Sequence, residues 1–167
     1  KSALDEFQKQ QTSQICGAGN TLLRIINEVL DFSKIESGTF RVQDAPFNPQ
    51  RMMNEIMDIL NPLAEKHGVD LKLGEIDFLN SDLVGDEGRL SQVLINLGSN
   101  AIKFSPNGAV TLNWVSRESD DGLSTQNKIW VHDNGIGIEA KKIGSIFDAF
   151  EQVDNSSTRK VGGSGLG

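Results

Sequence analysis

An acidic side chain followed by two spaced glycines is the clearest candidate for ligand binding in this sequence. The motif Asp133-Asn134-Gly135-Ile136-Gly137-Ile138 follows residues 128–132, where apolar and polar side chains alternate as in a half-buried strand. A carboxylate at the end of a strand can accept hydrogen bonds from an amine. Glycines let the backbone approach a flat or phosphorylated ligand because no Cβ intervenes. The alternative interpretation is a simple turn that begins at Asn134-Gly135.

Two asparagines and a lysine form a second group of candidates. Asn96, Asn100 and Lys103 follow one another at steps of four and three within a predicted helix at residues 87–104, so their side chains stack along one side. Amide oxygens suit a hard cation such as Mg²⁺, and a lysine suits phosphate. The pattern therefore indicates a Mg²⁺–phosphate site, with a solvated helix face as the alternative.

A second glycine-rich run, Gly-Gly-Ser-Gly-Leu-Gly, occupies residues 162–167. Such a run can present backbone N–H groups to phosphate. It follows a polar segment at residues 153–161, which we expect to be mobile unless a ligand orders it.

A long helix is predicted at residues 3–36, ahead of all these candidates. Apolar side chains recur there at steps of three and four, and a second apolar stripe runs beside the first. The first stripe comprises Ile15, Ala18, Leu22, Ile25, Val29 and Phe32, and the second comprises Leu23, Ile26 and Leu30. A helix with so wide an apolar face is typical of a bundle, so we expect it to pair with another copy of the chain.

Shorter helices and strands are predicted after this helix. We expect strands at residues 39–44, 69–73, 109–116 and 127–133, and helices at 49–66, 87–104 and 139–146. Residues 45–49 are expected to form a break, in which Asn48 caps the next helix and Pro49 takes its first position. Residues 74–81 are expected to form a loop. The inward side chains of the helix at 49–66 should be Met52, Met53, Ile56, Ile59, Leu60 and Leu63.

Composition limits the classes of function. A chain of 167 residues, 37% of them hydrophobic, can form one domain with a helical appendage. Its formal net charge of -7 argues against binding to nucleic acid or to an anionic membrane surface. The single cysteine, Cys16, excludes an internal disulfide and fits a reducing compartment such as the cytoplasm. No apolar run reaches the roughly 18 residues of a membrane span.

Four polar clusters occur in sequence at residues 96–104, 133–138, 147–150 and 163–167. In this order they resemble the asparagine box, first glycine box, phenylalanine box and second glycine box of sensor histidine kinases, in the gyrase and histidine-kinase ATPase superfamily. Residues 31–38 are similar to the end of the second dimerisation helix in that family, especially in hybrid kinases. The resemblance implies a dimerisation helix at residues 1–37. It also implies a two-layer α/β (α+β) sandwich at residues 38–167, with helices on one face of a mixed sheet.

The resemblance also implies roles for individual residues. Asp133 would pair with the adenine amine of ATP, and Gly135 and Gly137 would line the base. Asn100 would bind Mg²⁺ with Asn96 beside it, Lys103 would reach the phosphates, and Asn96 and Lys103 would be the catalytic residues. Residues 151–162 would be the ATP lid. The remaining ATP-binding residues would be Phe147, Phe150, Gly163, Gly165, Leu166 and Gly167.

The chain departs from the family in two respects. The family's phosphoacceptor histidine lies on the first dimerisation helix, and neither His67 nor His132 has that context. The family's domain also continues past the second glycine box with a helix and two strands, so this chain resembles a domain that is truncated at its C-terminus. We therefore expect the ATP-binding catalytic part of a histidine kinase, which transfers the γ-phosphoryl group to a histidine elsewhere for relay to a receiver aspartate.

Two other functions stay open. A gyrase-like ATPase would hydrolyse ATP, but such enzymes carry a glutamate one turn before the metal-binding asparagine. This chain has Asn96 there, and an amide cannot act as a general base. The second alternative is a catalytically inactive dimerising scaffold. The expected partners are a second copy of the chain, through the first helix, and a receiver domain, with membrane contact only through other regions of the parent protein.

Overall fold

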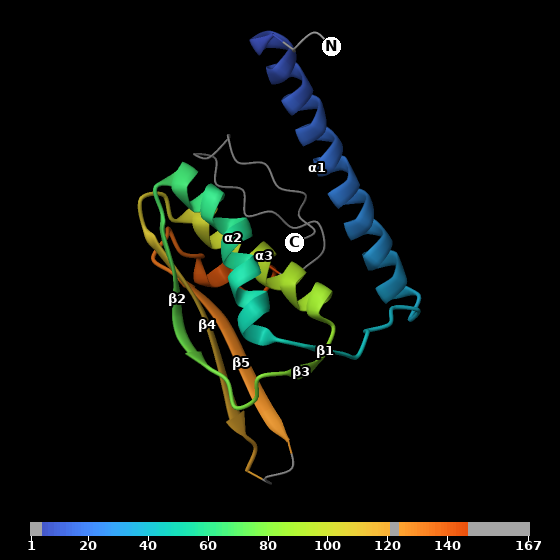
Figure 1. Ribbon diagram of the computed structural model, residues 1–167, viewed down its shortest axis with the longest axis vertical. Helices are drawn as coiled ribbons and strands as arrows, with labels where there is room; N and C mark the ends of the chain where they lie inside the picture. Colours follow the sequence, from blue (N-terminus) through green and yellow to red (C-terminus); the bar gives the residue numbers. More distant parts are fainter. Residues whose placement is uncertain (1–4, 121–123, 147–167) are drawn as a thin grey trace. The chain divides into compact units, whose positions relative to one another are not determined.

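The computed structural model describes residues 5–120 and 124–146, and its longest element is the helix α1, Glu6–Glu36 (Figure 1). Asp5 caps this helix, because its Oδ1 accepts a hydrogen bond of 2.7 Å from the N–H of Gln8. The Gln8 side chain accepts in return from the N–H of Asp5 at 3.1 Å. Ser37 ends the helix. The helix predicted at residues 3–36 is therefore confirmed within the described residues.

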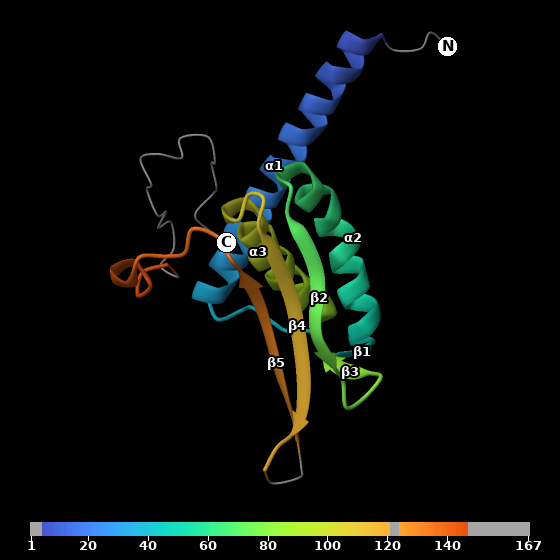
Figure 2. The ribbon, with the colours of Figure 1, turned by 90° about the vertical axis from the view of Figure 1, so that its left-hand side faces the viewer.

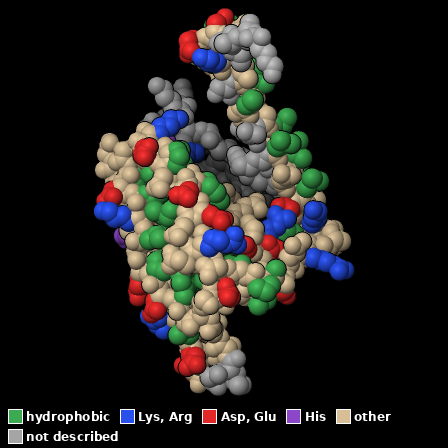
Figure 3. Space-filling model, in the orientation of Figure 1, with side chains coloured by type: hydrophobic (Ala, Val, Ile, Leu, Met, Phe, Trp, Pro, Cys, Tyr) green, Lys and Arg blue, Asp and Glu red, His purple; other side chains and the backbone are tan. Residues whose placement is uncertain are grey.

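Large apolar side chains are exposed along α1 (Figure 3). Their exposed fractions lie between 44% and 70%, and they are Phe7, Ile15, Leu22, Leu23, Ile26, Val29, Leu30 and Ile35. They include members of both predicted stripes. An apolar surface of this extent is typical of a helix that packs against a partner.

A second unit, Val42–Glu139, has two layers (Figures 1 and 2). The helices α2, Pro49–His67, and α3, Glu87–Phe104, cover one face of a three-stranded sheet. The strands are β2, Asp70–Asp77, β4, Ala109–Glu118, and β5, Thr125–Asp133, in the order β2-β4-β5. β2 is parallel to β4, and β4 is antiparallel to β5, so the predicted mixed sheet is confirmed. Two short strands, β1, Ala45–Phe47, and β3, Leu83–Gly85, pair separately.

The predicted start of α2 is confirmed. Asn48 is the N-cap, its Oδ1 accepts from the N–H of Arg51 at 2.8 Å, and Pro49 is the first helical residue. Most of the predicted inward side chains are buried or partly buried, but Ile59 is 57% exposed. That prediction is wrong because of the helical rotation of about 100° per residue. Met52 marks one edge of the buried stripe around the helix, and Ile59 projects just beyond that edge, toward solvent.

Trp114, in the middle of β4, is the largest fully buried side chain among the described residues. Its side chain is 1% exposed, and its ring centroid lies 6.4 Å from that of Phe47 and 5.4 Å from that of Phe78. The same core contains buried side chains of α2, α3 and β4, among them Met52, Met53, Ile56, Leu60, Leu94, Ala101, Ile102, Val110 and Leu112. The core therefore fixes α3 and the sheet relative to each other.

The predicted strand at residues 39–44 is wrong. These residues form no regular strand, and the strand β1 lies instead at Ala45–Phe47, where a break was expected. The N–H groups of Thr39 and Phe40 donate to the carbonyl oxygen of Lys34 at 3.0 and 3.1 Å. Because the end of α1 takes these donors, they are not available to a strand ladder.

The loop predicted at residues 74–81 is wrong over its first half, because β2 continues to Asp77. The register between β2 and β4 shifts between Leu73 and Ile76, and there Oδ1 of Asn113 accepts from the N–H of Glu75 at 2.7 Å. Such a bulge interrupts the alternation of apolar side chains, so the sequence pattern indicates a loop.

The helix predicted at residues 139–146 is also wrong, because that segment contains only the short 3-10 helix η1, Ala140–Lys142. Gly144 lies within the segment, and glycine weakens a helix by about 1 kcal/mol relative to alanine. In the part of the chain that the structure describes, no helix is long and apolar enough to cross a membrane.

Candidate functional site

Asp133 is the last residue of β5, and two hydrogen bonds hold its exposed carboxylate. Oδ1 accepts from the N–H of Gly135 at 2.9 Å and from the hydroxyl of Ser105 at 3.2 Å. Ser105 follows α3 directly, so its contact joins the end of a helix to the end of a strand. The carboxylate is therefore held at a defined position where a ligand can reach it.

The turn after β5 is bonded to the turn after α3. The N–H of Ile136 donates to the carbonyl oxygen of Phe104 at 3.2 Å, and the N–H of Ala109 donates to Oδ1 of Asn134 at 2.8 Å. The N–H of Asn134 donates in return to the carbonyl oxygen of Ala109 at 3.4 Å. These bonds place residues 133–136 against the C-terminal end of α3.

Gly135 and Gly137 are needed for different reasons. A Cβ at Gly135 would lie 2.3 Å from the carbonyl oxygen of Phe104 and 2.5 Å from Oγ of Ser105, which is too close for any side chain. Gly137 has a φ of 69°, in the left-handed region where residues with a side chain are strained. The motif therefore bends the chain directly after β5, and this bend holds Asp133 beside the end of α3.

Helix α3 carries the other described candidates. Asn96 and Lys103 are half-buried, and Asn100, one turn after Asn96, is exposed. Nζ of Lys103 lies 5.3 Å from the ring centroid of Phe104. The structure thus brings the end of α3, through Phe104 and Ser105, to the Asp133 turn. Lys103 directly precedes Phe104, and Asn100 and then Asn96 lie further back along the helix.

Asp86 caps the other end of α3. Its Oδ1 accepts from the N–H of Arg89 at 3.0 Å, and its Oδ2 accepts from the N–H of Gln43 at 3.0 Å. The N–H of Gln43, and then that of Arg89, hold the pKa of the Asp86 carboxyl below its ordinary value of 3.8, because both bonds favour the charged form. The start of α3 is therefore bonded to the segment that precedes β1.

Comparison with known proteins identifies the family that part of this chain matches. The family described as histidine kinase-, DNA gyrase B-, and HSP90-like ATPase matches residues 85–167, a range that contains α3 and both glycine motifs. Residues 85–167 of the chain belong to this ATPase family. The match confirms the ATPase superfamily that the asparagine and glycine motifs resemble.

The sensor kinases among the relatives are similar over the whole chain. The autoinducer 2 sensor kinase/phosphatase LuxQ of Vibrio harveyi is 40% identical over 172 residues, covering 100% of this chain and 20% of LuxQ. The sensor histidine kinase GacS of Pseudomonas protegens is 40% identical over 169 residues, covering 100% of this chain and 18% of GacS. This chain therefore spans about a fifth of the length of these relatives.

A solved structure supports the same fold for this ATPase family member. Full-length ShkA in complex with AMPPNP is 26% identical and has a TM-score of 0.73, over 99% of this chain and 33% of that one. The catalytic domain of the histidine kinase ThkA has a TM-score of 0.57 over 74% of this chain. The two-layer α/β architecture is therefore that of histidine kinase catalytic domains.

The remaining predicted ATP-binding residues of the ATPase domain lie outside the described residues. They are Phe147, Phe150, Gly163, Gly165, Leu166 and Gly167, and the expected lid at residues 151–162 lies there too. Their roles stay predictions.

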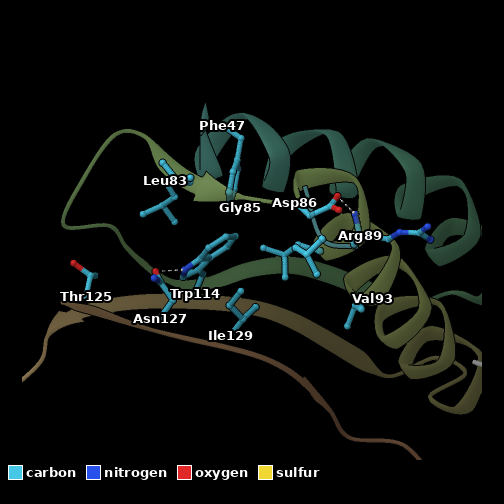
Figure 4. A pocket seen from close by; sticks show the side chains of 13 residues that line it. Phe47, Leu83, Gly85, Asp86, Arg89, Val93, Trp114, Thr125, Asn127 and Ile129 are labelled. Atoms are coloured by element: carbon cyan, nitrogen blue, oxygen red, sulfur yellow. Dashed lines mark hydrogen bonds between the residues drawn. The ribbon is translucent and has the colours of Figure 1, made fainter. Parts of the chain in front are cut away.

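A hollow of about 630 Å³ lies near the start of β5 and of α3 in the ATPase domain (Figure 4). Its walls are mostly apolar, and Nε1 of Trp114 donates there to Oδ1 of Asn127 at 3.0 Å. The residues that line it do not include Asn96, Asn100, Lys103 or Asp133. The hollow is therefore distinct from the predicted ATP site.

The sequence-based predictions missed Ser105 and Asn134 as parts of this site. Ser105 lies outside every motif that the sequence analysis singles out, and Asn134 stands within the Asp133 motif without a role of its own. Ser105 is 28 residues from Asp133 in the chain, so no local pattern could pair them. The sequence shows Ser105 only as a short polar residue directly after an amphipathic helix. Such a residue predicts the end of a helix and gives no tertiary partner. Only the tertiary structure shows that Ser105 is 2% exposed and aimed at Asp133.

Proposed function

We propose that this chain binds ATP at the adjoining ends of β5 and α3. In the intact protein, the γ-phosphoryl group would then pass to a histidine on another segment. The observation that carries the proposal is the position of the Asp133 carboxylate, which is held through Oδ1 beside the helix that bears Asn100 and Lys103. The family and the AMPPNP complex of the similar protein ShkA support it.

Asp133 would select the base. Its carboxylate can accept a hydrogen bond from the exocyclic amine of adenine, and it would repel the carbonyl oxygen that guanine has at that position. Gly135 leaves the backbone accessible to a flat ring. Ile136 and Ile138, which are 62% and 52% exposed, offer apolar surface beside it.

The amides on α3 fit a magnesium ion that is bound mainly by phosphate. Mg²⁺ prefers oxygen ligands and usually keeps several waters. Asn100 would supply one amide oxygen, with Asn96 beside it. Residues 5–120 and 124–146 contain no group of three or more His, Cys, Asp and Glu side chains that could hold a metal. The phosphates and water would supply the other ligands, and the bound ion would neutralise phosphate charge during transfer.

Lys103 would act on the phosphates as a fixed positive charge. It stands one turn beyond Asn100 and one residue before the end of α3, so the same helix presents an amide and an ammonium group. With no covalent chemistry required of the protein, Asn96, Asn100 and Lys103 would act by positioning and by charge neutralisation.

Transfer to histidine is favoured over hydrolysis. Asn96 stands one turn before Asn100, and an amide cannot activate water as a carboxylate does. The relatives LuxQ and GacS are sensor kinases. A gyrase-like hydrolase is the second candidate, and an inactive dimerising scaffold is the third.

Two partners follow from this proposal. A second copy of the chain would pair through α1, where described members of both apolar stripes are exposed. A receiver domain would take the phosphoryl group from the histidine. Neither described histidine is suited to accept phosphate first, because His67 ends α2 and His132 lies within β5.

A radiolabelled-ATP assay tests the proposal. The protein is incubated with [γ-³²P]ATP together with the parent's own segment that carries the acceptor histidine. Acid-labile label on histidine is the expected result. Free phosphate without labelled protein would instead indicate a hydrolase, and no turnover would indicate a scaffold. Asp133→Ala serves as the site-specific control and should lower labelling at limiting ATP by about 10- to 100-fold.

A further inference from the structure

Ser105 has a buried hydroxyl in a position that its backbone fixes. Its N–H donates to the carbonyl oxygen of Ile102 at the end of α3, and its own carbonyl oxygen accepts from the N–H of Gly108 at 2.8 Å. The side chain is 2% exposed, and its Oγ lies 3.2 Å from Oδ1 of Asp133. The hydroxyl therefore reaches the carboxylate from a helix that is anchored in the core.

Both hydrogen bonds that the Asp133 carboxylate accepts from the described residues end on the same oxygen. The N–H of Gly135 and the hydroxyl of Ser105 both donate to Oδ1, so Oδ2 is the oxygen left for a ligand. The χ2 angle of an aspartate is broadly distributed, and a single contact would leave the carboxylate free to turn. Two donors, from two different elements, restrict that rotation.

We infer that Ser105 is a positioning residue, which aims Oδ2 of Asp133 at the exocyclic amine of an adenine base. The inference rests on the proposed function, since it names the residue that gives the Asp133 contact its direction. It also gives a second reason for a glycine at position 135. A Cβ there would lie 2.5 Å from Oγ of Ser105, so only glycine admits the hydroxyl.

The inference separates adenine recognition from general nucleotide binding. Without the hydroxyl, Asp133 keeps one donor and its carboxylate samples other orientations, so its hydrogen bond to the amine weakens. Contacts to ribose, phosphate and magnesium do not involve Ser105. The loss should therefore appear for ligands that carry the amine and be absent for ligands that lack it.

The test compares ATP with purine riboside triphosphate, which has no exocyclic amine, by calorimetric titration of the intact protein. We expect the wild type to bind ATP more tightly than the analogue. Ser105→Ala should lose about tenfold in ATP affinity, which corresponds to one charge-assisted hydrogen bond, and keep its affinity for the analogue. Ser105→Thr should restore ATP binding, because it returns the hydroxyl.

Ser116 offers a matched control. It is also a buried serine, 1% exposed, and its hydroxyl lies 2.7 Å from Oδ1 of Asn127, at the other end of β5. Ser116→Ala should lower thermal stability without changing the ratio of the two affinities. If Ser105→Ala does not fold, Ser105→Cys keeps the shape of the side chain, with a larger sulfur that is only a weak donor, and should show the same selective loss.

Three results would overturn the inference. Equal loss of affinity for ATP and the analogue in Ser105→Ala would make Ser105 merely structural. An unchanged ratio in a folded Ser105→Ala protein would show that the hydroxyl does not direct Asp133, while the proposed Asp133–adenine contact would stand. No preference for ATP in the wild type would remove that contact itself, and the inference with it.

Discussion

Oδ2 of Asp86 accepts a hydrogen bond of 3.0 Å from the backbone N–H of Gln43, which lies 43 residues earlier in the chain. The other oxygen of the same carboxylate caps α3 through Arg89. Gln43 precedes β1 by two residues, and Asp86 follows β3 directly. One carboxylate therefore extends the β1–β3 pairing and fixes the start of the helix that carries the predicted phosphate-binding residues.

Two variants should separate these tasks of Asp86. Asp86→Asn keeps a good helix cap, because the amide oxygen can still accept from Arg89, but its NH₂ group cannot accept from Gln43. Gln43→Pro removes the donor and leaves Asp86 unchanged. Each should lower the midpoint of thermal unfolding, and the double variant should lower it no further than the larger single effect. Additive losses would mean that the two residues are not coupled.

The pH dependence of stability should report the same carboxylate. The pKa of Asp86 is held below 3.8, chiefly by the N–H of Gln43. A lowered folded pKa contributes stability that is present above the unfolded pKa and is lost as the pH falls through the folded pKa. The stability advantage of the wild type over Asp86→Ala should therefore be full at pH 7 and shrink below about pH 4. Urea unfolding at several pH values measures it, and a constant advantage down to acid pH contradicts it.

Asp133→Ala should weaken ATP binding by about 10- to 100-fold, because a hydrogen bond to a charged group contributes about 1.5–3 kcal/mol. Calorimetric titration with ATP measures the change. Asp58→Ala is a suitable control, since it removes an exposed carboxylate from α2 and gives the same change in net charge. Unchanged ATP affinity in a folded Asp133→Ala protein would exclude Asp133 as the adenine-binding residue.

Asn100→Asp should impair phosphotransfer more than it impairs binding of adenosine. Asn100 is exposed on α3, so the change is compatible with the fold. A carboxylate still offers oxygen to magnesium, but its charge repels the phosphates, and adenosine has none. Labelling by radioactive ATP and titration with adenosine give the two quantities. Equal losses in both would indicate that Asn100 is structural.

The elements that position the site could largely be predicted from the sequence. Asn48 and Pro49 mark the start of α2, and a long apolar periodicity marks α3. These local features are sufficient to predict the positions of both helices. The strand predicted at residues 39–44 failed because Thr39 and Phe40 donate to Lys34 at the end of α1. Alternation alone cannot show that a backbone donor is already in use.

The contacts that aim the site could not be predicted. Asp133 stood out because an acid precedes two glycines, but its partner Ser105 comes from a different element. Asn134 was assigned to a turn, and its amide also bonds to Ala109 across the strand end. Such contacts depend on the packing of α3 against the sheet, which the core around Trp114 determines.

Helix α1 should hold two copies of the chain together. Its exposed side chains include Ile15, Leu22 and Val29, and burying about six large side chains would contribute on the order of 10 kcal/mol, at 1.5–3 kcal/mol each. Leu22→Glu combined with Val29→Glu puts two charges into the predicted interface. We expect the unmodified chain to sediment as a dimer in analytical ultracentrifugation, and the double variant to sediment as a monomer.

The control adds the same charge to the polar side of the same helix. Gln10 and Asn27 are exposed on α1 and lie outside both apolar stripes, so Gln10→Glu combined with Asn27→Glu should leave the dimer intact. Dissociation by this control would mean that added charge alone disrupts assembly. A monomeric wild type at high micromolar concentration would refute pairing through α1, because the exposed leucines, isoleucines and valine would then have no second copy to bury them.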